Sequence, residues 1–303
     1  EAGSKEWRDY VNFRDYLRAV PAVVQEYEAL KLELARELGR AEYLEGKAPF
    51  VARTLEEAEV WARMGRGGRV SKIEKGWSGD RKFRVELADG ELCLLRLTPK
   101  CEKAERVFGL MKAVEGTGVP MARALDWGPW DEGAYMMQDW VEGEDLEAVL
   151  PDLSEREQYR LGAKAGEALR RIHVLPAPPD LEPWEARFNR KIDRKIELYE
   201  GCGLRFEGDE MIVGYLEAKR ALLAGRPQCV QHGDYHVGNM MLVDGRELVI
   251  IDYDRYDYGD PWEEFNRIVW SAQASPAFAR GQVRGYFGGE PPELFFKLLA
   301  LYI

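Results

Sequence analysis

The stretch VQHGDYHVGN, residues 230–239, decides the fold of this chain. Its polar residues come in a fixed order: four residues separate Asp234 from Asn239, and twelve separate Asn239 from Asp252. Those twelve, residues 240–251, read MMLVDGRELVII, which is two apolar runs around an Asp-Gly pair. That pattern is a strong signal for a β-hairpin. A hairpin folded at the Asp-Gly turn brings Asn239 and Asp252 to the same open end.

Asn239 and Asp252 would then present an amide oxygen and a carboxylate to one cation. Mg²⁺ prefers such oxygen ligands together with phosphate oxygens. An Asp that orients a hydroxyl, followed by an Asn and a second Asp that hold the metal, is the order found in phosphoryl-transfer centres. We therefore expect Asp234 to orient the acceptor hydroxyl, with Mg²⁺ and ATP or GTP as cofactors.

The composition fits a globular protein of two domains, or of one two-lobed domain with an appendage. Because no run of eighteen apolar residues occurs, we expect a soluble cytoplasmic protein without a membrane partner. The net charge of -11 disfavours nucleic acid and weakly favours a cationic small molecule. The 4 cysteines lack CxxC spacing, which predicts reduced thiols. Both chain ends look cut rather than natural.

Residues 1–65 are predicted to be helical. One amphipathic helix begins at Pro21, and a further helix is expected to begin at Thr54, because Thr54 and Glu57 form a capping-box pair. The glycine-rich stretch at residues 64–69 reads as a linker. We place the domain boundary there, with one domain at residues 1–65 and the other at residues 66–303.

A small antiparallel meander is predicted next, with strands at residues 70–74, 83–87 and 91–97. The loop after the first strand contains Ser78 and Gly79, which could lie over nucleotide phosphates. A plain hairpin turn is the alternative.

Arg96 is a cation inside the apolar third strand, where an unpaired charge is costly. We expect it to contact nucleotide phosphates and to pair with Glu105, or with Glu102 as second choice. The alternative is that Arg96 binds a surface carboxylate at the sheet edge.

The strand beginning at residue 134 turns polar at its end, and Asp139 to Val141 would form a hinge whose backbone contacts the nucleotide base. The chain is mainly helical after residue 153, where Ser154 and Glu157 make a capping box. The predicted lobes are therefore residues 66–141 and residues 142–303.

Residues 70–303 resemble the aminoglycoside phosphotransferase and choline kinase group. The resemblance rests on HGDxHxGN at residues 232–239, IDYD at residues 251–254 and GDP at residues 259–261. It implies an α+β, two-lobed protein-kinase-like fold, with a small β lobe and a helical lobe. The roles it implies are catalytic base for Asp234, Mg²⁺ ligands for Asn239 and Asp252, and bracing of the loop for His232 and Asp260. Many members of the group have Lys at the position of Arg96.

Three phrases in the first domain resemble the C-terminal part of GrpB-family domains, which have a nucleotidyltransferase-like fold. They are FRDYLR at residues 13–18, YEALK at residues 27–31 and YLEGK at residues 43–47. The upstream half of such a domain is missing from the chain. We expect a packing or docking appendage here rather than a catalytic domain.

The function that the sequence predicts is a kinase that phosphorylates a hydroxyl of a small cationic acceptor, such as an aminoglycoside in antibiotic resistance. Alternatives are a kinase of macrolides, choline, amino alcohols or sugars, or a nucleotide-binding scaffold. The loop lacks the Arg-Asp form, and Asp-Phe-Gly is absent at Asp252, which disfavours a protein kinase. Candidate acceptor contacts are Asp145, Asp254, Asp257, Glu263, Glu264 and Trp270, although packing alone could explain Trp270.

Overall fold

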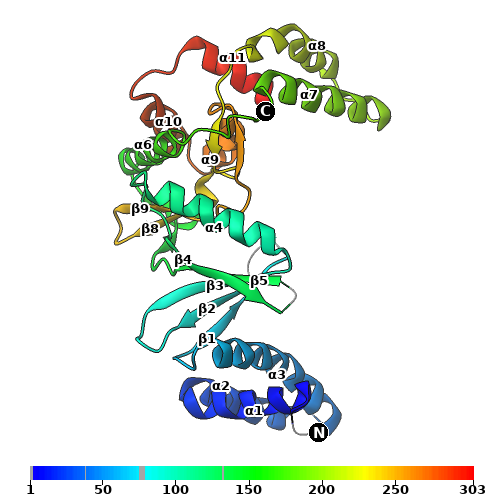
Figure 1. The fold of residues 1–303 in the computed structure, drawn as a ribbon, viewed down its shortest axis with the longest axis vertical. Coiled ribbons are helices and arrows are strands. Elements are labelled where there is room, and N and C mark those ends of the chain that lie inside the picture. The colour runs from blue at the N-terminus through cyan, green and yellow to red at the C-terminus, as the bar shows by residue number, and fades with distance from the viewer. Residues whose placement is uncertain (1–2, 38, 75–78, 132) are drawn as a thin grey trace. The chain divides into compact units, whose positions relative to one another are not determined.

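The computed structural model describes residues 3–37, 39–74, 79–131 and 133–303 (Figure 1). The chain forms two compact units. The first unit comprises Glu1–Phe108 and Arg123–Trp140, and the second comprises Gly109–Ala122 and Val141–Ile303. No helix in the described ranges combines the length and the apolar character that crossing a membrane requires.

The first unit contains a 5-stranded antiparallel sheet in the order β1-β2-β3-β5-β4. The predicted meander is present, with strand ends shifted by one or two residues. In β2, Phe83 and Val85 are buried while their neighbours are not, because successive side chains alternate between the faces of a strand. The strands are β1 (Val70–Ile73), β2 (Arg81–Glu86), β3 (Leu92–Thr98), β4 (Ala124–Trp130) and β5 (Gly133–Asp139).

Three helices precede this sheet and share its hydrophobic core (Figure 1). They are α1 (Lys5–Ala19), α2 (Pro21–Glu37) and α3 (Arg40–Arg63). Their buried side chains lie in one cluster with apolar residues of β1, β2 and β3, so the helices and the sheet form one folded body. The helical members are Tyr16, Val20, Val23, Phe50, Ala58, Val60 and Trp61, and the strand members include Val70, Phe83, Val85, Leu95 and Leu97.

The helices also satisfy backbone groups along β1, the edge strand of the sheet. The fully buried Tyr16 hydroxyl donates to Val70 O at 2.7 Å and accepts from Val70 N at 3.1 Å. The Glu57 carboxylate accepts from Lys72 N at 3.0 Å. Burial raises the pKa of Glu57 and raises that of Tyr16 to about 12. Because an unpaired edge strand is a template for unwanted pairing, these contacts protect the edge as well as hold it.

The predicted helix start at Thr54 is wrong. A single helix, α3, runs from Arg40 to Arg63, and Gly39 is its N-cap. Thr54 lies inside this helix and is fully buried, while Glu57 bonds β1 rather than a cap. The local capping-box spacing was therefore a coincidence, because packing against the sheet favours a continuous helix.

The second unit is mainly helical (Figure 1). Helix α4 (Cys101–Glu115) enters it from the first unit. The capping box at Ser154 and Glu157 is present as predicted and begins α6. The remaining helices are α5 (Leu146–Val149), η1 (Leu150–Asp152), α6 (Glu155–Ile172), α7 (Trp184–Gly201), α8 (Asp209–Lys219), η2 (Arg220–Leu223), η3 (Val237–Asn239), η4 (Glu263–Arg267), α9 (Ile268–Ala274), α10 (Pro276–Phe287) and α11 (Glu293–Tyr302).

Helices α6 and α10 pack very closely because glycines line their contact. A Cβ on Gly162 would lie 2.0 Å from Phe278 O, and one on Gly285 would lie 2.1 Å from Ala163 O.

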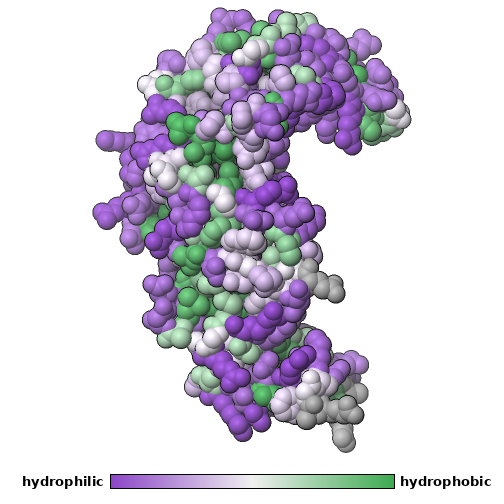
Figure 2. All heavy atoms as spheres, viewed as in Figure 1, coloured by the Kyte–Doolittle hydropathy of each residue, from purple (hydrophilic) through white to green (hydrophobic). Residues whose placement is uncertain are grey.

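At the far end of α7 and α8, Figure 2 shows hydrophobic surface among hydrophilic residues. The exposed apolar side chains of this region are Leu198, Leu204, Phe206, Met211 and Ile212.

Two small sheets carry the central stretch of the second unit. Strand β7 (Cys229–Gln231) pairs with β10 (Asp257–Gly259), and β8 (Met240–Val243) lies between β6 (Glu144–Asp145) and β9 (Glu247–Ile250). The predicted hairpin is β8–β9, in which Met240 pairs with Ile250 and Val243 with Glu247. Its turn residues Asp244 and Gly245 have φ of 50° and 64°. The hairpin places Asn239 and Asp252 just outside its open end.

Candidate active site

Gly233 makes the tight turn that begins the central loop, residues 232–239. Its φ is +83°, and a Cβ there would lie 1.8 Å from Arg255 O. Its backbone N–H donates to the Glu264 carboxylate, at 3.0 Å to Oε1. Only glycine combines this conformation with so close a backbone approach. The loop is therefore fixed against the segment that follows Asp252.

His232 braces the loop from inside the core. Its ring is fully buried, with Nε2 3.0 Å from Ile251 O, and Nδ1 accepts from Asp234 N at 3.3 Å. Burial lowers the pKa of His232, so the ring is neutral at neutral pH. A neutral ring with its proton on Nε2 satisfies both contacts. The bracing role that the resemblance implied for His232 stays a prediction.

Asn239 and Asp252 meet at the open end of the hairpin. Asn239 Nδ2 donates to Asp234 O at 2.8 Å, and Ile251 N donates to Asn239 O at 3.1 Å. Asp252 has a φ of 65°, a strained conformation for a residue with a Cβ. Because the Asn239 amide nitrogen is engaged, its Oδ1 is left for another partner. An amide oxygen beside a carboxylate fits the oxygen ligands that Mg²⁺ prefers.

Asp234 holds an unsatisfied oxygen at the centre of the loop. Its Oδ1 is buried and has no hydrogen-bond partner within the described part of the chain. Three basic side chains surround the carboxylate without bonding it: Arg267 Nε lies 3.6 Å from Oδ1, Arg255 Nε 3.8 Å from Oδ2 and His236 Nε2 3.7 Å from Oδ1. A buried oxygen without a partner costs stability, so this arrangement is typical of a site that receives a ligand.

Asp260 anchors the segment behind the loop. It is fully buried, and Arg226 binds both of its oxygens, at 2.5 and 2.8 Å. The Tyr302 hydroxyl donates to Oδ2 at 2.6 Å, and Trp262 N donates to Oδ1 at 2.9 Å. The carboxylate is thus compensated on every side, which is how a buried charge is tolerated. The structural role that the resemblance implied for Asp260 stays a prediction.

In the first unit, Arg96 is only 4% exposed and its ion-pair partner is Asp80, at 3.0 Å. Lys103 also approaches Asp80, at 3.7 Å. The predicted partners Glu105 and Glu102 are exposed on α4, and within the described ranges neither forms an ion pair with Arg96. The prediction was wrong because Asp80, at the start of β2, reaches the strand cation directly. Gly79 is exposed, and Ser78 lies outside the described residues.

The predicted hinge coincides with the boundary between the units, which falls between Trp140 and Val141. The Asp139 carboxylate accepts from Arg123 Nε at 2.6 Å, and its backbone N–H donates to Arg123 O at 2.9 Å. Trp140 N donates to Leu92 O at 3.2 Å. These bonds occupy the backbone N–H groups of Asp139 and Trp140, so the Asp139 N–H is not available to a nucleotide in this arrangement.

The predicted acceptor contacts divide into several kinds. Glu264 is 3% exposed and holds the Gly233 N–H, so the prediction that it contacts the acceptor is corrected: it braces the loop. Glu263 is likewise buried, and it binds Lys191 at 2.9 Å.

The other acidic candidates are more exposed. Asp257 is exposed and lies 3.5 Å from Arg187, and Asp145 is exposed at the start of α5. Asp254 is half-buried in the loop after Asp252.

Trp270 is 40% exposed rather than packed in the core. Its ring meets the His236 ring edge-on at 4.9 Å, and the Arg267 guanidinium lies 4.7 Å from it. The sequence analysis assigned no role to Arg255, Arg267 or His236, which lie beside Asp234. No spacing rule could have found the two arginines, because only the folding of η4 and of the loop after Asp252 brings them to the carboxylate.

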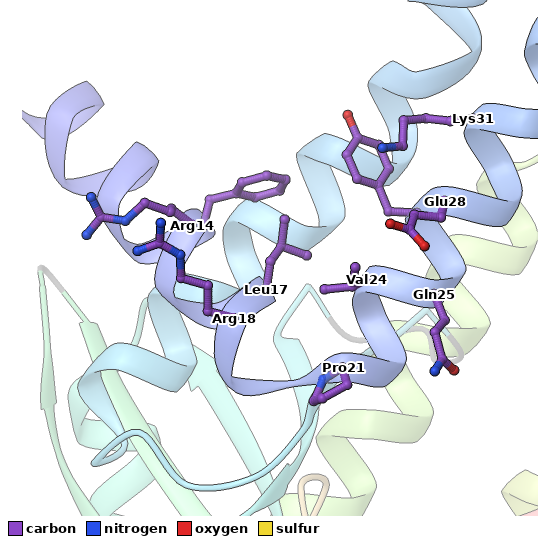
Figure 3. Close-up of a pocket in the computed structure, with 10 residues that line it drawn as sticks. Arg14, Leu17, Arg18, Pro21, Val24, Gln25, Glu28 and Lys31 are labelled. Carbon is purple, nitrogen blue, oxygen red and sulfur yellow. The ribbon is translucent and has the colours of Figure 1, made fainter.

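A groove of about 720 Å³ is lined by residues of α1 and α2 (Figure 3). Leu17 of α1 and Val24 of α2 face each other across it, while Arg14 and Arg18 extend away from α2. Phe13, Pro21, Gln25, Tyr27, Glu28 and Lys31 complete its lining. The groove contains none of the residues of the central loop.

The model of the phosphotransferase enzyme family matches residues 69–296, and the model of the GrpB protein family matches residues 1–57. A glucosamine kinase from Streptacidiphilus jiangxiensis is 26% identical over 159 residues, which cover 49% of this chain and 35% of that protein. A UPF0157 protein from Deinococcus radiodurans is 45% identical over 58 residues, which cover 19% of this chain and 31% of that protein. The chain thus spans about a third of the length of each relative.

Solved structures share the fold at low identity. APH(2")-IIa in complex with streptomycin and ATP gives a TM-score of 0.58 at 15% identity, over 80% of this chain and 85% of that chain. A thermostable mutant of aminoglycoside phosphotransferase APH(4)-Ia with ADP and hygromycin B gives 0.58 at 19%, over 81% and 86%. A choline/ethanolamine kinase family protein from Mesorhizobium loti gives 0.53 at 19%, over 76% and 74%. The predicted α+β protein-kinase-like fold is confirmed.

Proposed function

Because the chain belongs to the phosphotransferase enzyme family, we propose that it transfers the γ-phosphoryl group of ATP or GTP to a hydroxyl of a small sugar-like acceptor. The observation that carries this proposal is the buried Asp234 Oδ1, which has no hydrogen-bond partner among the described residues. It lies in a loop whose other end, Asn239, meets Asp252 through the hairpin. The described groups therefore fit an acceptor hydroxyl at Asp234 and a metal at Asn239 and Asp252.

Asp234 would hold the acceptor hydroxyl and take its proton, because the carboxylate oxygen is unsatisfied until a donor arrives. Asn239 and Asp252 would hold Mg²⁺, which supplies charge neutralisation for phosphate oxygens when bound. Arg96, buried and paired with Asp80, would offer its guanidinium to the nucleotide phosphates. Placement and charge compensation carry most of the catalysis in phosphoryl transfer, and these residues supply both.

The acceptor classes that this proposal covers are amino sugars, including aminoglycoside-type antibiotics, and then macrolides, choline, amino alcohols and simple sugars. The glucosamine kinase relative supports a sugar-like acceptor, although the match covers about a third of that protein. A nucleotide-binding scaffold remains the competing function of another class. The unsatisfied Asp234 oxygen favours the enzyme, because a scaffold gains nothing from a buried oxygen without a partner.

The proposal is tested with Asp234→Asn, which keeps the shape of the side chain and removes its charge. We expect phosphoryl transfer to fall by about a thousandfold, since a positioned base contributes roughly two to four orders of magnitude. Nucleotide binding, measured by calorimetry with Mg²⁺, should survive. Transfer is measured with ATP and GTP against aminoglycosides, macrolides, choline and sugars. Nucleotide binding without product from any acceptor would support the scaffold instead.

A further inference from the structure

Two arginines lie beside the Asp234 carboxylate without hydrogen-bonding to it. Arg255 Nε and Arg267 Nε lie 3.8 and 3.6 Å from the carboxylate oxygens, which is beyond hydrogen-bond distance. Neither guanidinium donates a hydrogen bond within the ranges that the structure describes, and Arg267 Nε is buried without a partner. Two guanidinium groups with unused donors therefore face the place where the acceptor hydroxyl is proposed to sit.

Other arginines of the second unit show what a structural guanidinium looks like in this chain. Arg226 binds both oxygens of Asp260, at 2.5 and 2.8 Å. Arg220 binds Asp193 at 2.6 Å, and Arg187 binds Tyr258 O at 2.7 Å. Each of these side chains is held by short hydrogen bonds. Arg255 and Arg267 have none within the described residues. The Arg255 side chain is 59% exposed, whereas Arg267 is 31% exposed and its Nε is buried, which is costly for an unsatisfied charged group.

Arg267 is oriented by stacking instead of by hydrogen bonds. Its guanidinium lies 4.7 Å from the Trp270 ring, which in turn contacts the His236 ring at 4.9 Å. A guanidinium stacked on an aromatic face keeps its in-plane N–H donors for a planar or tetrahedral oxyanion.

The charge close to the two guanidinium groups favours an anionic group of the acceptor at that position. Arg255 and Arg267 lie within 4 Å of Asp234, while Glu264 holds Gly233 N and Asp257 pairs with Arg187. Glu147 and Asp252 lie nearer the two histidines of the loop. At the two guanidinium groups themselves, a cationic group would meet like charge. We propose that Arg255 and Arg267 together bind an oxyanion of the acceptor. The acceptor would then carry a phosphate or carboxylate group near the hydroxyl that is phosphorylated. This inference rests on the proposed function.

The first test compares acceptors that share one ring and differ in charge: glucose, glucosamine, glucuronate and glucose 6-phosphate. Transfer from ATP with Mg²⁺ is measured as kcat/KM, with the product identified by mass spectrometry. We expect kcat/KM for an anionic acceptor to exceed that for glucose by about tenfold or more, since a hydrogen bond to a charged group is worth that much. Equal values, or a preference for glucosamine, would overturn the inference.

The second test assigns the preference to the arginines. In Arg255→Gln and Arg267→Gln, the ratio of kcat/KM between the anionic and neutral acceptors should fall by about tenfold. Arg267→Lys, which keeps the charge but loses the fork, should give an intermediate ratio. Arg190→Gln is the matched control, because the Arg190 side chain is 62% exposed against 59% for Arg255 and lies on α7. Arg190→Gln should keep the wild-type ratio.

A uniform loss with every acceptor in the Arg255 and Arg267 variants would show that they act on the phosphoryl group in transit, and it would overturn the inference. Slow hydrolysis of ATP by water, measured without acceptor, reports the proposed kinase centre separately. Hydrolysis combined with a preference for glucosamine would overturn only the oxyanion pair. Absence of both hydrolysis and transfer in the full chain would overturn the proposed function itself, and this inference with it.

Discussion

At the scale of single residues, Gly233 shows how backbone shape sets the site. Its positive φ and the approach of Arg255 O leave no room for a side chain. The same turn aims its N–H at Glu264 and places Asp234 next in the chain. A glycine in a hairpin turn is common, but one with a carbonyl 1.8 Å from its absent Cβ ties two parts of the site together.

Gly233→Ala is expected to lower the free energy of unfolding by more than the roughly 1 to 3 kcal/mol of backbone strain alone, because the new methyl group also clashes with Arg255 O. Gly245→Ala is the matched control, since Gly245 has a φ of +64° and nothing within 4 Å of its Cβ position. Denaturant unfolding of both variants separates the cost of backbone strain from the cost of the clash. An equal loss of unfolding free energy in the two variants would contradict the close approach of Arg255 O to Gly233.

Asp260 is the second residue on which the site depends. Asp260→Asn should cost about 3 to 5 kcal/mol, because the change removes the fully buried carboxylate that pairs with Arg226, whose side chain is only 13% exposed. Asp193→Asn provides the comparison, since Asp193 also pairs with an arginine but its side chain is 65% exposed. That variant should lose about 1 kcal/mol at most. Thermal and denaturant unfolding measure both, and similar losses would argue against the burial account.

At the scale of elements, the helical segment that matches the GrpB protein family is part of the small sheet's fold. Helices α1 and α3 share a core with β1, β2 and β3 and bond the edge of β1. Strand β1 ends at Ile73, before the stretch in which Ser78 and Gly79 are predicted to lie over nucleotide phosphates. The appendage expected from the sequence is therefore a packed cover that holds this strand in place.

Tyr16→Phe tests that cover with little loss of volume. Removing the hydroxyl leaves Val70 N and Val70 O without their partner in a buried position, at a cost of about 1 to 3 kcal/mol. Tyr10→Phe should be nearly neutral, because Tyr10 is 74% exposed. Unfolding transitions and amide exchange at β1 are the measurements. Unchanged exchange at β1 in Tyr16→Phe would show that the strand is held without the helices.

At the scale of the whole molecule, two histidines of the central loop make stability depend on pH. Burial lowers the pKa of both His232 and His236 from the ordinary value of 6.5. In the unfolded chain they take up protons near pH 6.5, whereas in the folded chain they do so only at lower pH. The unfolded state then binds more protons, so the free energy of unfolding falls as pH drops below about 6.5 and is fully retained above it.

The expected slope from these groups is about 1.4 kcal/mol per pH unit for each histidine that stays neutral in the folded state. Denaturant unfolding at about pH 7.5 and about pH 5.5 should show it. In His236→Asn the difference between the two pH values should shrink, because one group no longer titrates. An identical pH dependence in this variant and the wild type would mean that His236 titrates normally in the folded protein.

The sequence by itself determined the features that depend on neighbouring residues. The β8–β9 hairpin follows from an Asp-Gly turn between apolar runs, and it alone brings Asn239 to Asp252. The strand meander, the capping box at Ser154 and the kinase family likewise follow from local patterns. Such patterns are readable because turn conformation and side-chain alternation are set within a few residues.

Only the tertiary structure decided which distant side chains meet. In the fold, Arg96 pairs with Asp80 rather than with Glu105. Glu264 binds Gly233 N, and Thr54 lies inside α3 rather than at the start of a helix. The tertiary structure also set Arg255 and Arg267 beside Asp234, at the proposed acceptor position. These outcomes depend on packing between elements and on the burial of charge, which no local pattern of residues encodes.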